Sequence, residues 1–129
     1  MTVNMASLPH QITFDCADAY TLAQFWSQVF ERPLHDDDHP GDPMALIPFE
    51  AGPGVLFIGV PEGKTVKNRL HLDLMPTDRT RDEEVERLMA AGGRIHEDHR
   101  RDDGTGWVTM LDPEGNEFCV ERSQAERAG

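Results

Sequence analysis

The sequence is poor in basic residues. Its 129 residues include 12 Lys and Arg against 24 Asp and Glu, which gives a formal net charge of −12. Proteins that bind nucleic acid present a basic surface to the phosphates, so this balance argues against a nucleic-acid partner. The same acidity suits a cationic ligand, but an acidic surface also serves solubility alone.

Cysteines and long apolar segments are also scarce. The two cysteines are too few for a framework of disulfides. No apolar run approaches the roughly 20 residues that are needed to cross a bilayer. The first residues lack the basic start and apolar centre of a signal peptide. We therefore expect a cytoplasmic protein without a membrane partner.

Several motifs that would indicate a known chemistry are absent. There is no glycine-rich phosphate loop of the G-x-x-x-x-G-K or G-x-G-x-x-G type. There is also no Cys-x-x-Cys, no His-Glu-x-x-His and no nucleophile elbow. His96 and His99 are three residues apart, which on a regular strand puts them on opposite faces and argues against shared metal ligation.

The sequence does contain two halves with a similar order of elements. In the first half, residues 11–16 alternate polar and apolar, as a half-buried strand does. Asp18 is a candidate N-cap for a helix whose apolar residues recur at helical spacing as far as Pro33. The other predicted segments of this half are an acidic loop at 35–43 and strands at 44–49 and 55–60.

The second half begins after a polar connection that ends near Asn68. A strand at 69–75 places His71 and Asp73 on one face. Thr80 and Glu83 form a capping box for the helix that follows. The other predicted segments are a helix stop at Gly92-Gly93, strands at 94–99, 107–111 and 117–121, and a frayed tail at 123–129.

This repeated order predicts an α+β protein made of two βαβββ modules. An offset of about 60 residues aligns the halves, although the matched identities are sparse. One shallow module cannot close a core alone, so two are expected to pair. A ferredoxin-like or dimeric-barrel fold is the competing interpretation, and it usually needs fewer strands.

The segment between the last two strands is Asp112-Pro113-Glu114-Gly115-Asn116, in which proline and glycine favour a hairpin turn. Near the N-terminus, Ile12-Thr13-Phe14-Asp15-Cys16-Ala17-Asp18 leads into a helix that bears Phe25-Trp26. With these motifs the chain resembles the vicinal-oxygen-chelate superfamily, which comprises glyoxalases, bleomycin-resistance proteins and ring-cleaving dioxygenases.

The resemblance covers residues 8–122 and implies a single domain. Its modules would span about 10–61 and 69–122, with tails at 1–7 and 123–129. In the family the mixed sheets of paired modules curl around a cup that holds the ligand, and many members are homodimers. We therefore expect a homodimer that binds a small molecule.

The resemblance also implies where a metal would bind. In metal-dependent members the ligands come from the first and last strands of each module, which here gives Gln11, Gly59, His71 and Cys119. Gly59 has no side chain, and Cys119 replaces a glutamate. Hard cations favour oxygen ligands, and stable zinc sites use four ligands or three plus water. We therefore expect no metal; if Zn, Ni, Mn or Fe is bound, its ligands would be His71, Gln11 and Cys119.

The cup would be lined mainly by side chains that alternate along the strands. A cavity with aromatic, aliphatic and a few polar groups suits a small organic ligand. His71 with Asp73 is a candidate general base, or simply a polar pocket wall. Cys119 is either a small half-buried apolar residue or, with His71, a nucleophile, and Trp107 either faces the cup or packs in the core. The predicted ligand-binding residues are Gln11, Thr13, Phe57, His71, Trp107, Thr109 and Cys119.

The leading hypothesis is a glyoxalase-like protein that binds a small organic molecule without the family's usual metal centre. The first alternative is a divalent-metal-dependent lyase, isomerase or dioxygenase of the glyoxalase kind. The second alternative is a dimeric regulatory module without a ligand.

Overall fold

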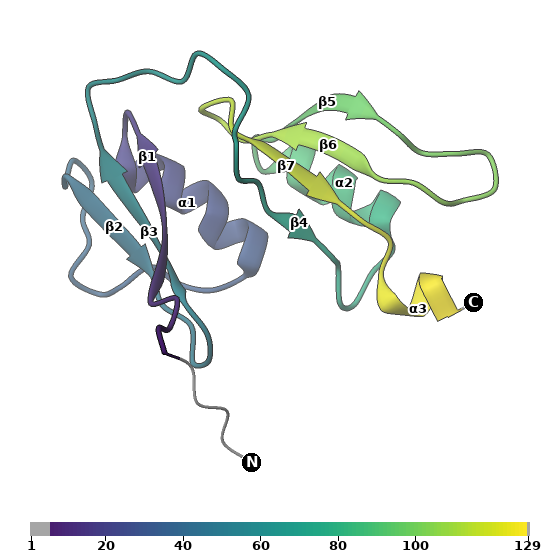
Figure 1. The fold of residues 1–129 in the computed structure, drawn as a ribbon, viewed down its shortest axis with the longest axis horizontal. Coiled ribbons are helices and arrows are strands. Elements are labelled where there is room, and N and C mark those ends of the chain that lie inside the picture. Colours follow the sequence, from purple (N-terminus) through teal and green to yellow (C-terminus); the bar gives the residue numbers. More distant parts are fainter. Residues whose placement is uncertain (1–5, 129) are drawn as a thin grey trace. The chain divides into compact units, whose positions relative to one another are not determined.

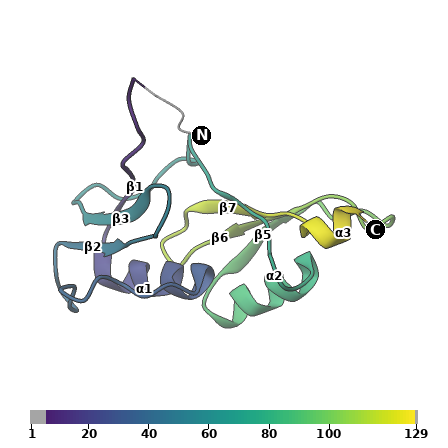
Figure 2. The same ribbon diagram turned by 90° about the horizontal axis from the view of Figure 1, so that it is seen from below.

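The structure is a computed structural model in which residues 6–128 are described. Contacts divide the chain into two compact units, of which unit 1 ends at Gly63 and unit 2 begins at Lys64. This boundary lies within the polar connection between the two halves of the sequence. Each unit contains a small mixed sheet with a helix against one face (Figures 1 and 2). The predicted α+β class is therefore confirmed.

Unit 1 is a three-stranded sheet with strand order β1-β3-β2. β1 and β3 pair in parallel, and β2 and β3 pair antiparallel. Helix α1 begins after Asp18, whose carboxylate accepts a hydrogen bond from the Thr21 amide at 3.2 Å, as an N-cap does. The elements of this unit are β1 (Gln11–Cys16), α1 (Ala19–Phe30), β2 (Met44–Ile47) and β3 (Gly54–Gly59).

An aromatic cluster fills the space between α1 and this sheet. The Phe14 ring lies 5.2 Å from the Trp26 ring and 5.1 Å from the Phe57 ring, measured between centroids. Trp26 and Phe57 have no exposed surface. Burial of each such side chain stabilises the fold by about 1.5–3 kcal/mol. These rings therefore form the core of unit 1.

The position of Phe57 differs from the prediction that it lines the ligand cup together with Gln11 and Thr13. The register of β1 and β3 pairs Phe57 with Phe14, and pairs Thr13 with Leu56. Directly paired residues on neighbouring strands share a face, and successive residues alternate. Phe57 therefore faces α1, opposite to Gln11 and Thr13, and it belongs to the core rather than to a pocket wall.

Unit 1 also has one strand fewer than a full βαβββ module among its described residues. The segment 35–38 runs along β2 in a turn conformation instead. The His35 amide donates to the Leu46 carbonyl at 2.9 Å, and the Leu46 amide donates to Asp38 Oδ2 at 2.7 Å. An aspartate side chain thus takes the place of the main-chain acceptor that a fourth strand would offer. Aspartate favours such turns because its carboxylate competes for backbone amides.

Unit 2 is a four-stranded sheet with strand order β4-β7-β6-β5, and it completes the predicted βαβββ order. β4 and β7 are parallel, whereas the other two pairs are antiparallel. β4 is shorter than the predicted strand at 69–75. The elements are β4 (Asp73–Leu74), α2 (Arg81–Ala90), β5 (Arg94–Asp98), β6 (Val108–Leu111) and β7 (Glu117–Val120).

Helix α2 covers one face of this sheet. Thr80 and Glu83 form the predicted capping box: the Glu83 amide donates to the Thr80 hydroxyl, and the Thr80 amide donates to the Glu83 carboxylate. The inward residues of β6 and β7 and of α2 have at most 1% of their surface exposed; they are Val85, Leu88, Val108, Met110, Phe118 and Val120. Their neighbours along β6 and β7 consequently point to the opposite face of the sheet.

The turn between β6 and β7 is built on Asp112. Its carboxylate has no exposed surface, and it accepts hydrogen bonds from the Glu114 amide, the Asn116 amide and the Asn116 side chain at 2.8–3.0 Å. Gly115 has φ of +86°, which glycine adopts without strain. The hairpin turn predicted from the sequence is thus confirmed.

The C-terminal segment is not a frayed tail within the described residues. Gln124–Ala128 forms a short helix, α3. The Glu126 amide donates to the Ser123 hydroxyl, and the Ser123 amide donates to the Glu126 carboxylate, so the pair is a second capping box. The tail predicted at the N-terminus falls mostly on residues 1–5, which lie outside the described part. None of the described helices is long and apolar enough to cross a membrane.

Candidate functional site

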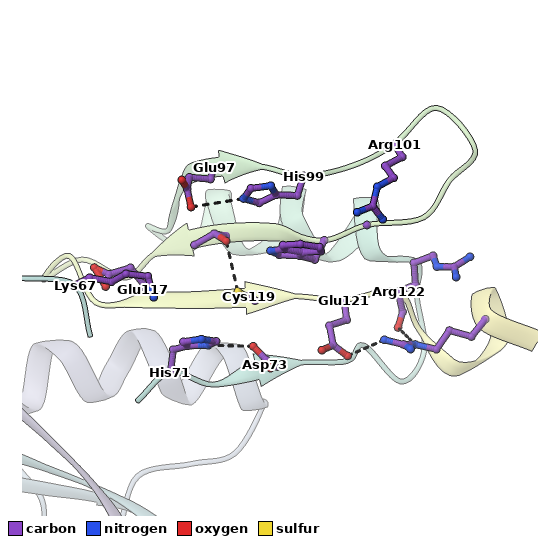
Figure 3. A pocket seen from close by; sticks show the side chains of 14 residues that line it. Lys67, His71, Asp73, Glu97, His99, Arg101, Glu117, Cys119, Glu121 and Arg122 are labelled. Atoms are coloured by element: carbon purple, nitrogen blue, oxygen red, sulfur yellow. Dashed lines mark hydrogen bonds and ion pairs between the residues drawn. The ribbon is translucent and has the colours of Figure 1, made fainter. Parts of the chain in front are cut away.

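A row of four side chains crosses the face of the unit 2 sheet that is opposite to α2. The strand register pairs Asp73 with Cys119, Cys119 with Thr109, and Thr109 with Glu97, one residue from each strand. A pocket of about 500 Å³ lies over this row (Figure 3). Its lining comes entirely from unit 2: Lys67, His71, Asp73, Glu97, His99, Arg101, Gly106, Trp107, Thr109, Glu117, Cys119, Glu121, Arg122 and Arg127.

A β-bulge in β5 brings Glu97 to this face. Ile95 pairs with Met110 and Glu97 pairs with Thr109, so His96 is an extra residue in the ladder. Without the bulge, Glu97 would share the face of Ile95. A regular strand at 94–99, as the sequence predicts, has no such bulge, and Glu97 and His99 are therefore not among the predicted site residues. Nothing in the composition of this segment marks the bulge.

The stretch after β5 forms an aromatic wall of the pocket. The His99 ring stacks on Trp107 with 4.6 Å between centroids and an interplanar angle of 23°. The Arg101 guanidinium lies over the same indole at 5.9 Å from its centroid, within the range of a cation–π contact. Trp107 is 36% exposed. Of the two predicted roles for Trp107, the structure therefore places it at the pocket rather than in the core.

Arg81 holds the loop that precedes Trp107. Its buried guanidinium donates hydrogen bonds to three successive backbone carbonyls, those of Gly104, Thr105 and Gly106, at 3.0–3.2 Å. Gly106 has φ of +93°, and a Cβ there would overlap the His99 carbonyl. The geometry of the aromatic wall thus depends on one buried arginine and one glycine, neither of which the sequence analysis singled out.

His71 and Asp73 lie together, as the strand pattern predicts. His71 Nδ1 is 3.1 Å from Asp73 Oδ1, and both side chains are partly exposed toward the pocket (Figure 3). At this distance the carboxylate can fix the orientation of the imidazole. A catalytic role for this pair stays a prediction.

Cys119 lies between this pair and Thr109. Its Sγ is 3.5 Å from Thr109 Oγ1, within hydrogen-bond distance. Burial raises the pKa of the Cys119 thiol; the hydrogen bond with Thr109 lowers it, and the charge and hydrogen bond of Asp73 raise it further. The net effect is a raised pKa, so the thiol keeps its proton at neutral pH. A thiol of this kind is a poor nucleophile, because the thiolate is the reactive form.

Glu117, two residues earlier on β7, is held by a different set of groups. Its largely buried carboxylate is 2.6 Å from Lys64 Nζ and accepts a hydrogen bond from the Asn68 amide at 2.8 Å. Burial alone would raise the pKa of this carboxyl, but Lys64 and the Asn68 amide outweigh burial and lower it. Glu117 therefore stays ionised and fastens the segment 64–68 to the sheet.

A sequence profile described as a glyoxalase-like domain matches residues 11–121, most of the chain. The chain belongs to the glyoxalase-like family. No curated protein matches the sequence of this glyoxalase-like protein. The solved structures that resemble it include members of the glyoxalase, bleomycin-resistance and dioxygenase group, as the resemblance to the vicinal-oxygen-chelate superfamily predicts.

Three of these structures illustrate the likeness. A family enzyme from Burkholderia phytofirmans has 16% identity and a TM-score of 0.66, with 88% of this chain and 97% of that chain covered. The fosfomycin resistance protein FosX from Listeria monocytogenes, in complex with Mn(II) and a dihydroxypropylphosphonic acid, has 18% identity, 97% and 98% coverage and a TM-score of 0.68. A lactoylglutathione lyase from Agrobacterium tumefaciens has 15% identity, 95% and 97% coverage and a TM-score of 0.61. At these identities the likeness shows the fold alone.

The family raises the question of whether the glyoxalase-like protein has donors for a divalent metal. Ligand atoms of His71, Asp73 and Cys119 lie within 4.8 Å of one another. One nitrogen, one oxygen and one thiol suit a borderline ion such as Zn²⁺ better than Mg²⁺ or Mn²⁺, which favour oxygen. No fourth His, Cys, Asp or Glu joins this group among residues 6–128. The set therefore does not fit an oxygen-rich site, and for zinc it supplies three protein ligands, which would need a water as the fourth.

The remaining predicted residues of the glyoxalase-like protein lie in unit 1. Gln11 and Thr13 are exposed residues of β1, on the face of their sheet opposite to α1. Neither belongs to the three-residue cluster, nor does either line the pocket in unit 2. Their part in ligand or metal binding stays a prediction.

Proposed function

We propose that this glyoxalase-like protein binds a small organic molecule in the unit 2 pocket without the family's metal centre. The observation that carries the proposal is the state of the three donors. His71 is paired with Asp73, and Cys119 is a hydrogen-bonded thiol whose raised pKa keeps it protonated. A metal would have to displace that proton and compete with the pairing of His71 and Asp73.

The size and the lining of the pocket also support a small organic ligand. Its volume of about 500 Å³ lies in the range of about 300–1,000 Å³ that is usual for such ligands. The stacked His99 and Trp107 rings offer an aromatic surface, and Thr109 and His71 offer hydrogen-bonding groups. Shape and these few polar groups would select the ligand.

A second candidate function is a divalent-metal-dependent lyase, isomerase or dioxygenase. The approach of His71, Asp73 and Cys119 to within 4.8 Å favours it. In that case these three side chains would hold an ion such as Zn²⁺, which would polarise a substrate oxygen as a Lewis acid. The thiol of Cys119 disfavours this function, because it replaces the carboxylate that the family resemblance implies at position 119.

Metal analysis of the protein, purified without chelator, separates the two functions. We expect far less than one ion per chain, and no change in His71→Ala. His96→Ala is the matched control, because His96 is an exposed histidine of β5 that does not line the pocket. Near-stoichiometric Zn, Ni, Mn or Fe that disappears in His71→Ala but persists in His96→Ala would refute the metal-free proposal. Metal binding gained by Cys119→Glu alone would support it.

We further propose that the protein acts as a homodimer in the cytoplasm. The family resemblance supports the dimer. Light scattering of the purified protein tests it, because the dimer should have twice the chain mass of 14.5 kDa. A concentration-independent mass equal to one chain would exclude the dimer.

A further inference from the structure

We infer that the pocket takes an anionic ligand, a small molecule that carries a carboxylate or a similar anion beside a planar ring. This inference rests on the proposed function, because it assigns the chemistry of the ligand in the same pocket. It also differs from what the net charge of −12 suggests, namely a cation.

The carboxylates that line the pocket are already paired. Each has a basic or imidazole partner within 4.0 Å: Lys64 and Arg127 neutralise Glu117 and Glu121, whereas the histidines beside Asp73 and Glu97 are charged only when protonated. The four pairs are Glu117 with Lys64 at 2.6 Å, Glu121 with Arg127 at 2.7 Å, Asp73 with His71 at 3.1 Å, and Glu97 with His99 at 3.6 Å. A cationic ligand would have to compete with Lys64 for Glu117 and with Arg127 for Glu121.

Three basic residues of the lining are not paired in this way. Lys67, Arg101 and Arg122 have no carboxylate within 4.0 Å among the residues that the structure describes. The charges of Arg101 and Arg122 lower the pKa of Asp103, but they act from beyond contact distance. The Asp103 carboxylate accepts its hydrogen bonds from the amide and the hydroxyl of Thr105. The pocket therefore has positive charge that no side chain neutralises at contact distance.

The position of these charges suggests how the ligand lies. Figure 3 shows Arg101 and Arg122 toward one end of the pocket and Lys67 at the other. Arg101 lies over the indole of Trp107, which is partly exposed and stacked on His99. A planar ring placed against this aromatic wall would bring an attached anion to the two arginines. Guanidinium groups bind carboxylates through paired hydrogen bonds, which favours this orientation.

The net charge of the chain does not oppose this arrangement. At physiological salt the Debye length is about 8 Å, so distant surface carboxylates are largely screened. The groups within a few ångströms of the ligand then decide its charge. Near the aromatic wall those groups include Arg101 and Arg122, which have no carboxylate partner at contact distance among the described residues, and Glu121, which is already paired with Arg127.

A set of three probes with one shape and different charges tests the inference. Benzoate, benzamide and benzamidinium are planar and nearly isosteric, and they carry negative, zero and positive charge. Ligand-observed NMR titration of the full chain should show benzoate binding tightest, by about tenfold over benzamidinium, and weakening as salt is raised. Trp107→Phe should weaken all three probes, which places them at the aromatic wall.

Charge-removing variants locate the anion. Arg101→Gln and Arg122→Gln should each weaken benzoate by about two- to fivefold, the range of an exposed ion pair, and should leave benzamide unchanged. Arg94→Gln is the matched control, because it removes the same charge from an exposed β5 residue outside the pocket. Circular dichroism confirms that each variant is folded.

The outcomes separate the inference from the proposed function. Benzamidinium binding as tightly as benzoate or tighter, with Trp107→Phe weakening it, would overturn the anion preference and leave the pocket assignment standing. Benzoate affinity that falls in Arg94→Gln as much as in Arg101→Gln would overturn the location of the anion. Failure of all three probes to bind would overturn both.

Discussion

Position 119 is where the chemistry of this protein departs from the pattern that the family resemblance implies. A thiol stands at the place of a metal-binding carboxylate, next to Asp73 and Thr109. Because burial and Asp73 together raise the pKa of the thiol, its uncharged form predominates at neutral pH. The sequence could show the substitution. It could not show that Thr109 and Asp73 flank the sulfur, because that depends on the register of three strands.

The first residue-scale prediction concerns the reactivity of Cys119. We expect iodoacetamide at pH 8 to alkylate it more slowly than a free cysteine, because less of it is thiolate. Asp73→Asn removes a group that raises the pKa, so the rate should increase. The rate is measured by mass spectrometry in a Cys16→Ser background, which leaves one thiol per chain. An unchanged or slower rate in Asp73→Asn would contradict the assigned cause.

The second residue-scale prediction concerns the pH dependence contributed by Glu117. Its carboxyl pKa is lowered in the folded protein from an ordinary value of 4.5. Its stabilisation is therefore fully present above about pH 4.5 and is lost as pH falls through the lower folded pKa. Glu117→Gln should reduce the free energy of unfolding at pH 7 by about 2 kcal/mol, and the deficit should shrink in acid.

Urea denaturation of both proteins between pH 7 and pH 3 measures this deficit. Glu86→Gln, a substitution at an exposed position of α2, is the control and should have little effect at any pH. A deficit for Glu117→Gln that stays constant down to pH 3 would show that packing, rather than the ionised pair with Lys64, is responsible.

At the scale of elements, features set by neighbouring residues could be predicted and features set by distant partners could not. The Asp18 cap, the Thr80 box and the turn at Asp112 each depend on a few consecutive residues. The bulge at His96 depends on which β6 residues β5 must meet, and the replacement of a strand by the segment 35–38 depends on Leu46. Both features depend on contacts with residues far away in the sequence, and no pattern of neighbouring residues predicts them.

The short C-terminal helix is an instructive exception. Its signal, Ser123 followed three residues later by Glu126, is the same capping box that identified α2. The local sequence thus contains the signal for α3, and the predicted frayed tail is wrong for residues 124–128. Glu126 also accepts a hydrogen bond from the Arg81 amide at 2.7 Å, which ties α3 to the start of α2.

The element-scale prediction concerns the loop that Arg81 holds. Arg81→Lys keeps the charge but cannot reproduce the guanidinium contacts with three carbonyls. We expect the free energy of unfolding to fall by about 1–3 kcal/mol. Backbone amides of residues 104–107 should also exchange faster with deuterium. Arg94→Lys is the control at an exposed site, and equal exchange in both variants would refute the role of Arg81.

At the scale of the whole molecule, the two units share the order strand, helix, strand, strand, but they do not share a set of functional groups. The pocket and the three-residue donor cluster lie in unit 2. The sequence repeat predicted the shared order, because apolar residues recur at strand and helix spacing in both halves. It misplaced Phe57 because the face of a strand depends on its register with its neighbours, and alternation alone leaves two choices open.

If the unit 2 pocket binds its ligand without a metal, a chelator should not change the affinity of the pocket for benzoate. The affinity is measured before and after dialysis of the protein against a strong chelator. We predict the same dissociation constant in both samples, and no change when Zn²⁺ is added back. Loss of binding after dialysis, restored by Zn²⁺ in the natural protein but not in His71→Ala, would contradict it.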